Sequence, residues 1–331
     1  MIKSKKVLAA LVIAMTGLFV CGCDSSSGGE SKSITLKAGF STADSDPRVI
    51  ATQLFKEEVE KATDGRIKVE IHADGELGSD SELIEGVVNG EVDITASSAG
   101  NFANYSSNVG ISAFPFLFDD FEQAWAFVDG DVEAQAEKEL GDCNVKVLAH
   151  YDNGFRCVTT SDKAGPVNSV SDMSGLVIRT PENQIVMTTM QLLGAEPKVL
   201  EFTKLYDALK NGEFDAQENP VPVIYNNKLY EVQSNLAITN HSYDVMLFAI
   251  AQSTWDELSE EDQKILADAA KKAQDKDREL IKSQTEEFIQ KLQDEGMKVT
   301  NPDLEEFKKA TSSAVDVFAD TYDADLLNKI K

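Results

Sequence analysis

The segment Asn89-Gly90-Glu91-Val92-Asp93 recurs later in this chain as Asn211-Gly212-Glu213-Phe214-Asp215. Each copy follows an amphipathic run, at 82–88 and at 204–210, and leads into small and polar residues. A repeat at domain-sized spacing predicts two lobes built on one plan, not a short-period solenoid. Because small ligands bind preferentially in clefts between domains, two facing lobes favour a binding protein.

Strands and helices are expected to alternate around both copies of the repeat. The elements predicted in the first half are, in order, 34–40, 47–62, 67–71, 79–88 and 92–96, followed by a helix over 121–140 and a strand at 145–149. Those predicted in the second half are 176–178, a helix capped by Thr180, 198–201, a helix capped by Thr203, and 213–216. Such alternation implies an α/β fold with mainly parallel sheets and helices on their faces. A long, charged, amphipathic helical stretch, either continuous or broken once, follows at 259–296, and 303–327 is expected to be a terminal helix.

Residues 1–23 are predicted to be an export signal. Three lysines precede the apolar stretch 7–20, which is shorter than the roughly 20 residues of a membrane-spanning helix. Val20-Cys21-Gly22-Cys23 resembles a bacterial lipobox, which makes 1–22 a lipoprotein signal peptide and Cys23 the lipidated residue. An ordinary cleaved signal peptide is the alternative. The Ser- and Gly-rich segment 23–33 is then a flexible tether, which holds an exported protein in the periplasm or on the outer face of the cytoplasmic membrane.

Composition limits the partners of the chain. Its formal net charge of −26 disfavours nucleic acid, because binding to nucleic acid depends on neutralising phosphates. The same charge repels anionic ligands at long range, so an anion site must act locally through a few placed cations.

Cys143 and Cys157 are the two cysteines that remain after the export signal. Export permits a disulfide between them, and two free thiols fit the sequence equally.

Candidate ligand-binding residues follow the predicted strands of the second half. Ligands of open parallel sheets lie beyond the carboxyl ends of the strands, which here carry Arg179, Phe202 and Asn219. Arg179 offers a planar fork that suits a carboxylate, and an ion pair with Glu182 or Glu218 is its structural alternative. Asn219 suits a hydroxyl or carboxylate, and Phe202 suits a cleft wall.

Other candidates come from the passage between the halves and from the first half. Arg156 is a second cationic candidate and lies in the passage between the halves. It could contact the ligand, or it could form an inter-lobe salt bridge. In the first half the corresponding strand ends are polar, with Ser41, Thr42 and Ser98, and carry no cation. Glu82 lies one turn into the following helix, where a solvated helix face is its structural alternative.

Enzyme chemistry is not supported by the sequence. Its three histidines, His72, His150 and His241, are far apart, and no nucleophile-elbow or zinc-helix pattern is present. We therefore predict no catalytic residues, no metal and no cofactor, with His150 and His241 as structural or cleft residues.

Several segments together resemble the solute-binding proteins of tripartite ATP-independent periplasmic (TRAP) transporters, the DctP-type family. They are, in order, Gly75–Gly78, Gly175–Asn183, Leu193–Ala195, Leu205–Leu209, Asp215–Pro220 and Asn240–Tyr243. The similarity extends from Ile34 to the C-terminus. The resemblance implies a clamp by Arg179 on a ligand carboxylate and further ligand-binding residues in the matching segments, namely Arg156, Asn219, Glu82, Phe202, Asn183 and His241.

The resemblance also implies the overall architecture, a two-lobed periplasmic-binding-protein-like fold (type II-like) with crossing segments and a long bracing helix near the C-terminus. Lobe I is expected to comprise 34–154 with 246–283, and lobe II 155–245 with 284–331.

The function implied is that of a monomer that captures a small organic acid, either a sugar acid such as a uronate or a C4-dicarboxylate. It would deliver this acid to the membrane subunits of an ion-gradient-driven TRAP permease. The lipid anchor departs from the commoner soluble form of the family. A sensory or chemotactic binding component and, less favoured, a secreted enzyme are the alternatives.

Overall fold

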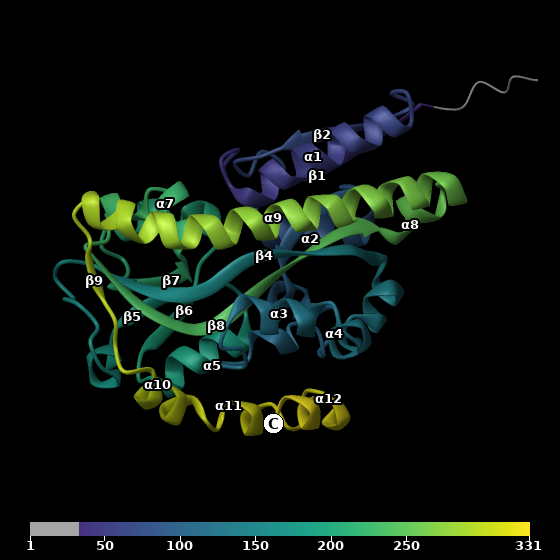
Figure 1. The fold of residues 1–331 in the computed structure, drawn as a ribbon. Helices are drawn as coiled ribbons and strands as arrows, with labels where there is room; N and C mark the ends of the chain where they lie inside the picture. Colours follow the sequence, from purple (N-terminus) through teal and green to yellow (C-terminus); the bar gives the residue numbers. More distant parts are fainter. Residues whose placement is uncertain (1–32) are drawn as a thin grey trace, which may run out of the picture. The chain divides into compact units, whose positions relative to one another are not determined.

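The computed structural model describes residues 33–331, and within them two long antiparallel strands form the middle of a nine-stranded sheet (Figure 1). These strands are β4 (Val145–Thr160) and β8 (Asn235–Ala251). The strand order is β2-β1-β3-β8-β4-β7-β5-β6, and β9 (Lys298–Thr300) pairs with β8. Because β4 and β8 run through both halves of the sheet, they are the crossing segments that join the two lobes.

The first half is built from β1 (Ile34–Gly39), β2 (Ile67–His72) and β3 (Ile94–Ser98), which are parallel to one another. Its helices are α1 (Pro47–Ala62) and α2 (Asp80–Asn89). The second half repeats this plan with parallel strands and short helices. They are β5 (Val177–Thr180), α5 (Gln184–Leu192), β6 (Glu196–Val199), α6 (Leu205–Lys210), β7 (Ala216–Pro220) and α7 (Val221–Asn226).

The repeated pentapeptide makes the same connection in both halves. The glycine of each copy follows a helix with a left-handed φ, of 74° and 73°, which glycine adopts without steric cost. The Asp93 carboxylate accepts a hydrogen bond from the Lys37 N–H on β1 (2.8 Å), and the Asp215 carboxylate accepts one from the Val177 N–H on β5 (3.1 Å). The backbone N–H groups of Asp93 and Asp215 donate to the carbonyls of the same two strand residues. The repeat therefore ties the third strand of each half to its first.

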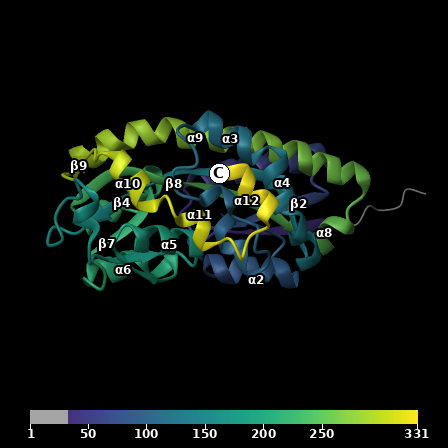
Figure 2. The same ribbon diagram turned by 90° about the horizontal axis from the view of Figure 1, so that it is seen from below.

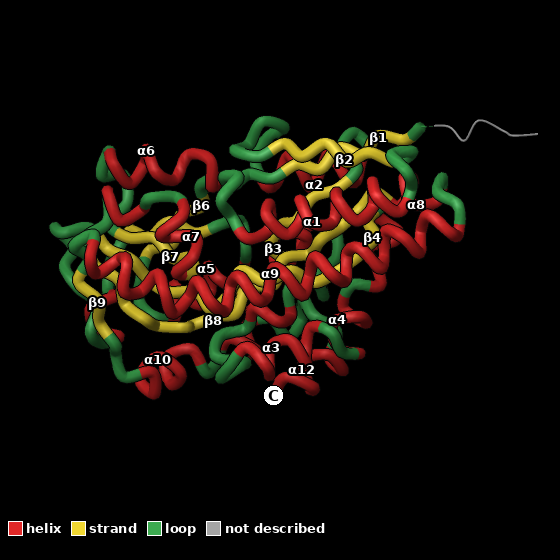
Figure 3. The backbone as a smooth tube through the Cα atoms, turned by 45° about the horizontal axis from the view of Figure 1, so that its top comes forward, coloured by secondary structure: helices red, strands yellow, loops and turns green. Residues whose placement is uncertain are grey.

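A single long helix braces both halves. Helix α9 runs unbroken from Glu260 to Asp294, starting from a Ser259 side chain that caps it. It lies along β4 and contacts α1 in the first half and α7 in the second (Figure 3). The bracing helix predicted from the charged amphipathic stretch is thus confirmed, without a break.

The C-terminal segment forms three short helices, α10 (Leu304–Thr311), α11 (Ala314–Val317) and α12 (Ala324–Ile330). They lie on the face seen in Figure 2, where α10 and α11 contact α5 and α12 contacts α4 (Asp131–Ala136). Phe318 and Tyr322 pack edge-on against Phe114, with ring centroids 5.6 and 5.5 Å away. The segment is therefore part of a core that includes both halves.

Several local predictions were wrong for identifiable reasons. The helix expected over 121–140 is divided, because Asp129 and Gly130 separate α3 (Phe121–Val128) from α4. Thr180 does not cap α5: the chain turns at Glu182, where the Asn183 N–H donates to the Pro181 carbonyl (2.8 Å), and the Asn183 side chain caps the helix. Thr203 lies within a turn of 3₁₀-helix and makes no cap bond to α6. The strand expected at 145–149 continues to Thr160, and β8 and the short α8 (Gln252–Asp256) were not predicted.

The predictions for the N-terminal segment fall almost entirely outside the described residues. The export signal, Cys23 and all but the last residue of the tether lie outside the described residues.

Cys143 and Cys157 are both free, which answers the question that the sequence left open, namely whether they form a disulfide. Burial raises the pKa of the Cys157 thiol to about 11. None of the helices in residues 33–331 combines the length and the apolar character needed to cross a membrane.

Candidate ligand-binding site

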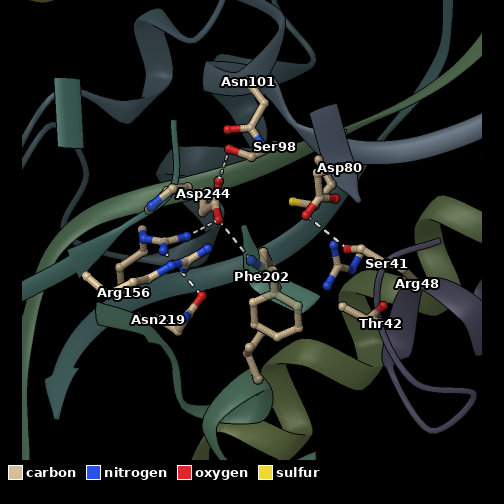
Figure 4. Close-up of a pocket in the computed structure, with 15 residues that line it drawn as sticks. Ser41, Thr42, Arg48, Asp80, Ser98, Asn101, Arg156, Phe202, Asn219 and Asp244 are labelled. Atoms are coloured by element: carbon tan, nitrogen blue, oxygen red, sulfur yellow. Dashed lines mark hydrogen bonds and ion pairs between the residues drawn. The ribbon is translucent and has the colours of Figure 1, made fainter. Parts of the chain in front are cut away.

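A polar cavity lies where the two halves of the sheet face each other (Figure 4). It contains about 400 Å³ of space between atoms, counting the part open to solvent. The residues that line it come from both halves and are Ser41, Thr42, Arg48, Asp80, Ser98, Asn101, Asn153, Arg156, Arg179, Pro181, Phe202, Asn219, Val223, Asp244 and Met246. Three cations, two carboxylates and several hydroxyl and amide groups thus converge on one small volume.

Arg179 is the cation whose charge is least satisfied. It lies in β5 and is only 2% exposed. Its Nε donates to the Leu200 carbonyl at 2.8 Å, and its guanidinium lies 5.9 Å from the centre of the Phe202 ring. Within residues 33–331 it has no ion pair with any carboxylate, so the expected alternative, a pair with Glu182 or Glu218, is not formed.

The electrostatic cost of this arrangement appears in the pKa of Arg179. Burial lowers that pKa to about 10, and the nearby Glu218 and Asp80 carboxylates offset only part of the effect. At neutral pH the side chain still carries its charge. A buried cation without a counterion is costly, because a charge removed from water needs a partner to replace its hydration. An incoming anion would supply that partner.

Arg156 is bound on all sides by the protein itself. Its Nε donates to Glu218 Oε2 at 2.5 Å, one of its terminal nitrogens donates to Glu218 Oε1 at 2.8 Å, and the other pairs with Asp244. Burial alone would lower the pKa of Arg156, but these two carboxylates raise it above its ordinary value. Arg156 therefore forms salt bridges, but Glu218 and Asp244 lie, like Arg156 itself, in the range expected for lobe II, so these pairs are not the inter-lobe bridge that the sequence suggested. A ligand contact by Arg156 stays a prediction.

Asn219 and Phe202 also lie at the cavity, as the strand-end rule predicts. The Asn219 side chain donates to Gln217 Oε1 at 2.6 Å and accepts from Arg156 at 3.2 Å. Phe202 forms the wall beside Arg179. Direct contact of either side chain with a ligand stays a prediction.

The other three candidates do not line the cavity. The Glu82 carboxylate accepts hydrogen bonds from the backbone and side chain of Ser79 (2.8 and 2.9 Å), which completes a capping box at the start of α2. Asn183 Oδ1 accepts from two backbone N–H groups at the start of α5. His241 is fully buried between Thr239 and Glu218. Each of these side chains has a structural contact, and no observation here tests a ligand contact.

The sequence reasoning missed Arg48, Asp80 and Asp244. Arg48 brings a cation to the first half of the cavity, where none was expected, and both Asp46 carboxylate oxygens accept from it (2.9 and 3.0 Å). Asp80 occupies the first turn of α2, directly after the capping Ser79, a position that could have signalled proximity to the strand ends. Asp244 lies inside β8, which was not predicted, so no sequence signal indicated it.

Among residues 33–331 no group of histidine, cysteine or acidic side chains is arranged to hold a metal ion.

Comparison with known proteins identifies the family. The family model for "Bacterial extracellular solute-binding protein, family 7" (DctP) matches residues 38–321. The chain belongs to this family. The family match confirms the resemblance to solute-binding proteins of TRAP transporters.

Individual relatives of this solute-binding protein match it over most of their length. The 2,3-diketo-L-gulonate-binding periplasmic protein YiaO of Escherichia coli is 32% identical over 299 residues, 90% of each chain. The sialic acid-binding periplasmic protein SiaP of Vibrio cholerae is 31% identical over 277 residues, 83% of this chain and 85% of the relative.

Solved structures show the same fold. A TRAP periplasmic solute-binding protein from Polaromonas sp. JS666, bound to D-erythronate, superposes with a TM-score of 0.86 at 34% identity, covering 90% of this chain and 98% of the other. The sugar acid-binding protein DctPAm from Advenella mimigardefordensis, in complex with galactonate, gives a TM-score of 0.87 at 28% identity, covering 90% and 97%. The solute-binding protein described here therefore has the predicted two-lobed fold.

Proposed function

We propose that this solute-binding protein captures a small organic acid of the sugar-acid class and holds its carboxylate on Arg179. The observation that carries the proposal is the buried Arg179 guanidinium, which lines the cavity and has no ion pair within the described residues. A charge-assisted hydrogen bond inside a water-poor site is stronger than in water, and the arginine fork can bind both oxygens of a carboxylate.

The relatives support the sugar-acid class. Diketogulonate, erythronate and galactonate, the ligands named for three of the relatives above, share a carboxylate and a chain of oxygen substituents. Hydroxyl and amide groups such as Ser41, Ser98 and Asn153 in the cavity wall suit those substituents.

The family and the N-terminal sequence support the remaining steps of the proposal. Lobe I (34–154 with 246–283) and lobe II (155–245 with 284–331) would close around the acid and then present it to the membrane subunits of an ion-gradient-driven TRAP permease. The protein would act as a monomer outside the cytoplasm, in the periplasm or on the outer face of the cytoplasmic membrane. There it would be held by the lipid on Cys23 and would carry out no catalysis.

Isothermal titration calorimetry with D-erythronate and D-galactonate tests the clamp. A charged hydrogen bond contributes roughly 1.5–3 kcal/mol, so Arg179→Ala should weaken binding by about one to two orders of magnitude. Arg179→Lys should recover part of the loss, because it keeps the charge but not the fork.

Lys198→Ala is the matched control. Lys198 lies opposite Arg179 in the register of β6 and β5. Its side chain is exposed and outside the cavity, so removing it should leave the affinity for the acid unchanged. Equal affinity of Arg179→Ala and wild type would show that the clamp is wrong.

A further inference from the structure

The two carboxylates of the cavity differ in how they are satisfied. Asp244 pairs with Arg156 and also accepts from Ser98 Oγ (2.6 Å) and Asn153 Nδ2 (2.8 Å). Asp80 accepts only from Ser41 Oγ (2.9 Å) and Ser97 Oγ (3.2 Å). Within residues 33–331 Asp80 has no ion pair, although it lies close enough to Arg48 and Arg179 to raise the pKa of each.

The three arginines show the same asymmetry. Arg48 is held by both oxygens of Asp46, and Arg156 is held by Glu218 and Asp244. In the described part of the chain, Arg179 is the cavity arginine that has no carboxylate partner. The cavity therefore offers one cation and one carboxylate that are free to act on a ligand, and they come from opposite halves of the fold.

Two further polar atoms in the cavity wall have no partner. Thr42 Oγ1 and Asn101 Oδ1 are buried and make no hydrogen bond within residues 33–331. A buried polar atom left unpaired is unfavourable, and neutral hydroxyl groups of a ligand can pair with both atoms. Asp80 already accepts from two serines, and a carboxylate has further lone pairs with which to accept from a ligand hydroxyl.

We propose that the cavity selects an acid with a single carboxylate and several hydroxyls, and that Asp80 is the specificity-determining residue that excludes a second carboxylate. The proposal rests on the proposed function, because it assigns the ligand carboxylate to Arg179. Asp80 then faces the hydroxylated part of the ligand, accepts its hydrogen bonds, and repels a carboxylate placed there. Rejecting one partner through like charge is a common route to specificity.

Acids that differ only at one end test this selection. D-galactonate and galactarate share their hydroxyl pattern, as do D-erythronate and meso-tartrate, but the second acid of each pair has a carboxylate where the first has a terminal hydroxymethyl group. 4-Amino-4-deoxy-D-erythronate, which has an ammonium group in place of the terminal hydroxyl of D-erythronate, tests whether Asp80 takes a cation instead. Calorimetry on the purified protein should show at least one hydroxy acid binding about a hundredfold more tightly than its dicarboxylate counterpart, and D-erythronate binding more tightly than its amino analogue.

Asp80→Asn tests the residue itself. The variant keeps one of the two oxygens that accept from the serines but loses the negative charge, so the preference for the monocarboxylate should fall by about tenfold or more. Glu85→Gln is the matched control: it removes one charge from an exposed position of the same helix, away from the cavity, and should leave the preference unchanged. Thermal melts establish that both variants fold.

The outcomes separate this proposal from the proposed function. Equal binding of a dicarboxylate and its hydroxy acid, an unchanged preference in Asp80→Asn, or tighter binding of 4-amino-4-deoxy-D-erythronate than of D-erythronate would overturn the selection and leave the Arg179 clamp standing. If none of the five acids binds, both the clamp and the selection are wrong.

Discussion

The Asn183 side chain lies directly against Gly100, across the boundary between the two halves of the fold. A Cβ atom at Gly100 would stand 1.8 Å from Asn183 Nδ2, far inside van der Waals contact. Asn183 is itself held in place, because its Oδ1 caps α5. Gly100 is therefore a position where the first half must lack a side chain for the second half to approach.

Gly100→Ala should weaken ligand binding without unfolding either half. The added methyl group can be relieved by moving the halves apart, and overpacking of this size costs typically about 1–3 kcal/mol. If that cost falls on the closed form, affinity for the cognate acid should decrease by about tenfold or more. Calorimetry measures the affinity, and small-angle X-ray scattering should report a larger radius of gyration for the variant in the presence of ligand.

Gly141→Ala is the control for this substitution. Gly141 lies in a 3₁₀-helix, and nothing stands within 4 Å of a Cβ added there, so affinity and scattering should match wild type. The double variant Gly100→Ala, Asn183→Ala should regain affinity relative to the single variant. If Gly100→Ala binds and scatters like wild type, the contact does not limit closure.

His150 is enclosed by acidic side chains. Its Nε2 lies 2.9 Å from Glu137 Oε1, its Nδ1 lies 3.5 Å from Asp129 Oδ1, and the buried Glu133 also faces it. Burial alone would lower the pKa of His150, but the bonds to Asp129 and Glu137 raise it to about 9. The folded protein therefore keeps a proton between pH 6.5 and 9 that the unfolded chain releases.

The stability conferred by His150 should be lost at high pH. Because its folded pKa lies above its unfolded value, the contribution is full below pH 6.5 and disappears as the pH rises through 9. Urea melts should show a wild-type advantage over His150→Gln that is larger at pH 6 than at pH 10, by at most about 3 kcal/mol. His72→Gln is the control, since its partner Glu76 is largely exposed and exposed ion pairs contribute little to stability. A difference for His150→Gln that is the same at both pH values would contradict the assignment.

Sequence patterns located those parts of the fold that depend on local signals. Capping residues and apolar periodicity placed α1, α2 and the parallel strands near their observed positions, and helical spacing over 259–296 predicted α9. The pattern failed at β8. That strand is apolar at one end and carries Thr239, His241 and Asp244 in its middle, polar groups that are buried because the rest of the fold supplies their partners. No local periodicity marks such a strand.

For the cavity, as for the fold, the sequence predicted the residues that local patterns mark and missed those that only tertiary packing brings in. Arg179 and Asn219 lie in the last residues of the parallel strands β5 and β7, and Phe202 comes soon after β6, so the strand-end rule brings them together. Arg48 and Asp244 reach the cavity only through tertiary packing, from the start of α1 and from the crossing strand β8. Asn183 was chosen as a ligand contact, and the structure adds that its side chain caps α5; the ligand contact stays a prediction.

Asp277→Asn should stabilise the protein at neutral pH. Asp277 lies fully buried in α9, where one carboxylate oxygen accepts from the Asp152 N–H at 2.5 Å and the other has no partner within the described residues. Burial, together with the nearby Asp152 carboxylate, raises the pKa of Asp277 well above its ordinary value of 3.8. The folded state thus holds a proton that the unfolded chain releases above that pH, so stability falls as the pH rises. An asparagine keeps the acceptor and removes the cost, which should add about 1–2 kcal/mol at pH 7 and almost nothing near pH 3.5.

Asp275→Asn, at an exposed position of the same helix, should change stability by less than about 0.5 kcal/mol at either pH. Chemical denaturation of the three proteins at both pH values decides the matter, and a destabilised Asp277→Asn at pH 7 would mean that the ionised carboxylate is the form that the fold prefers.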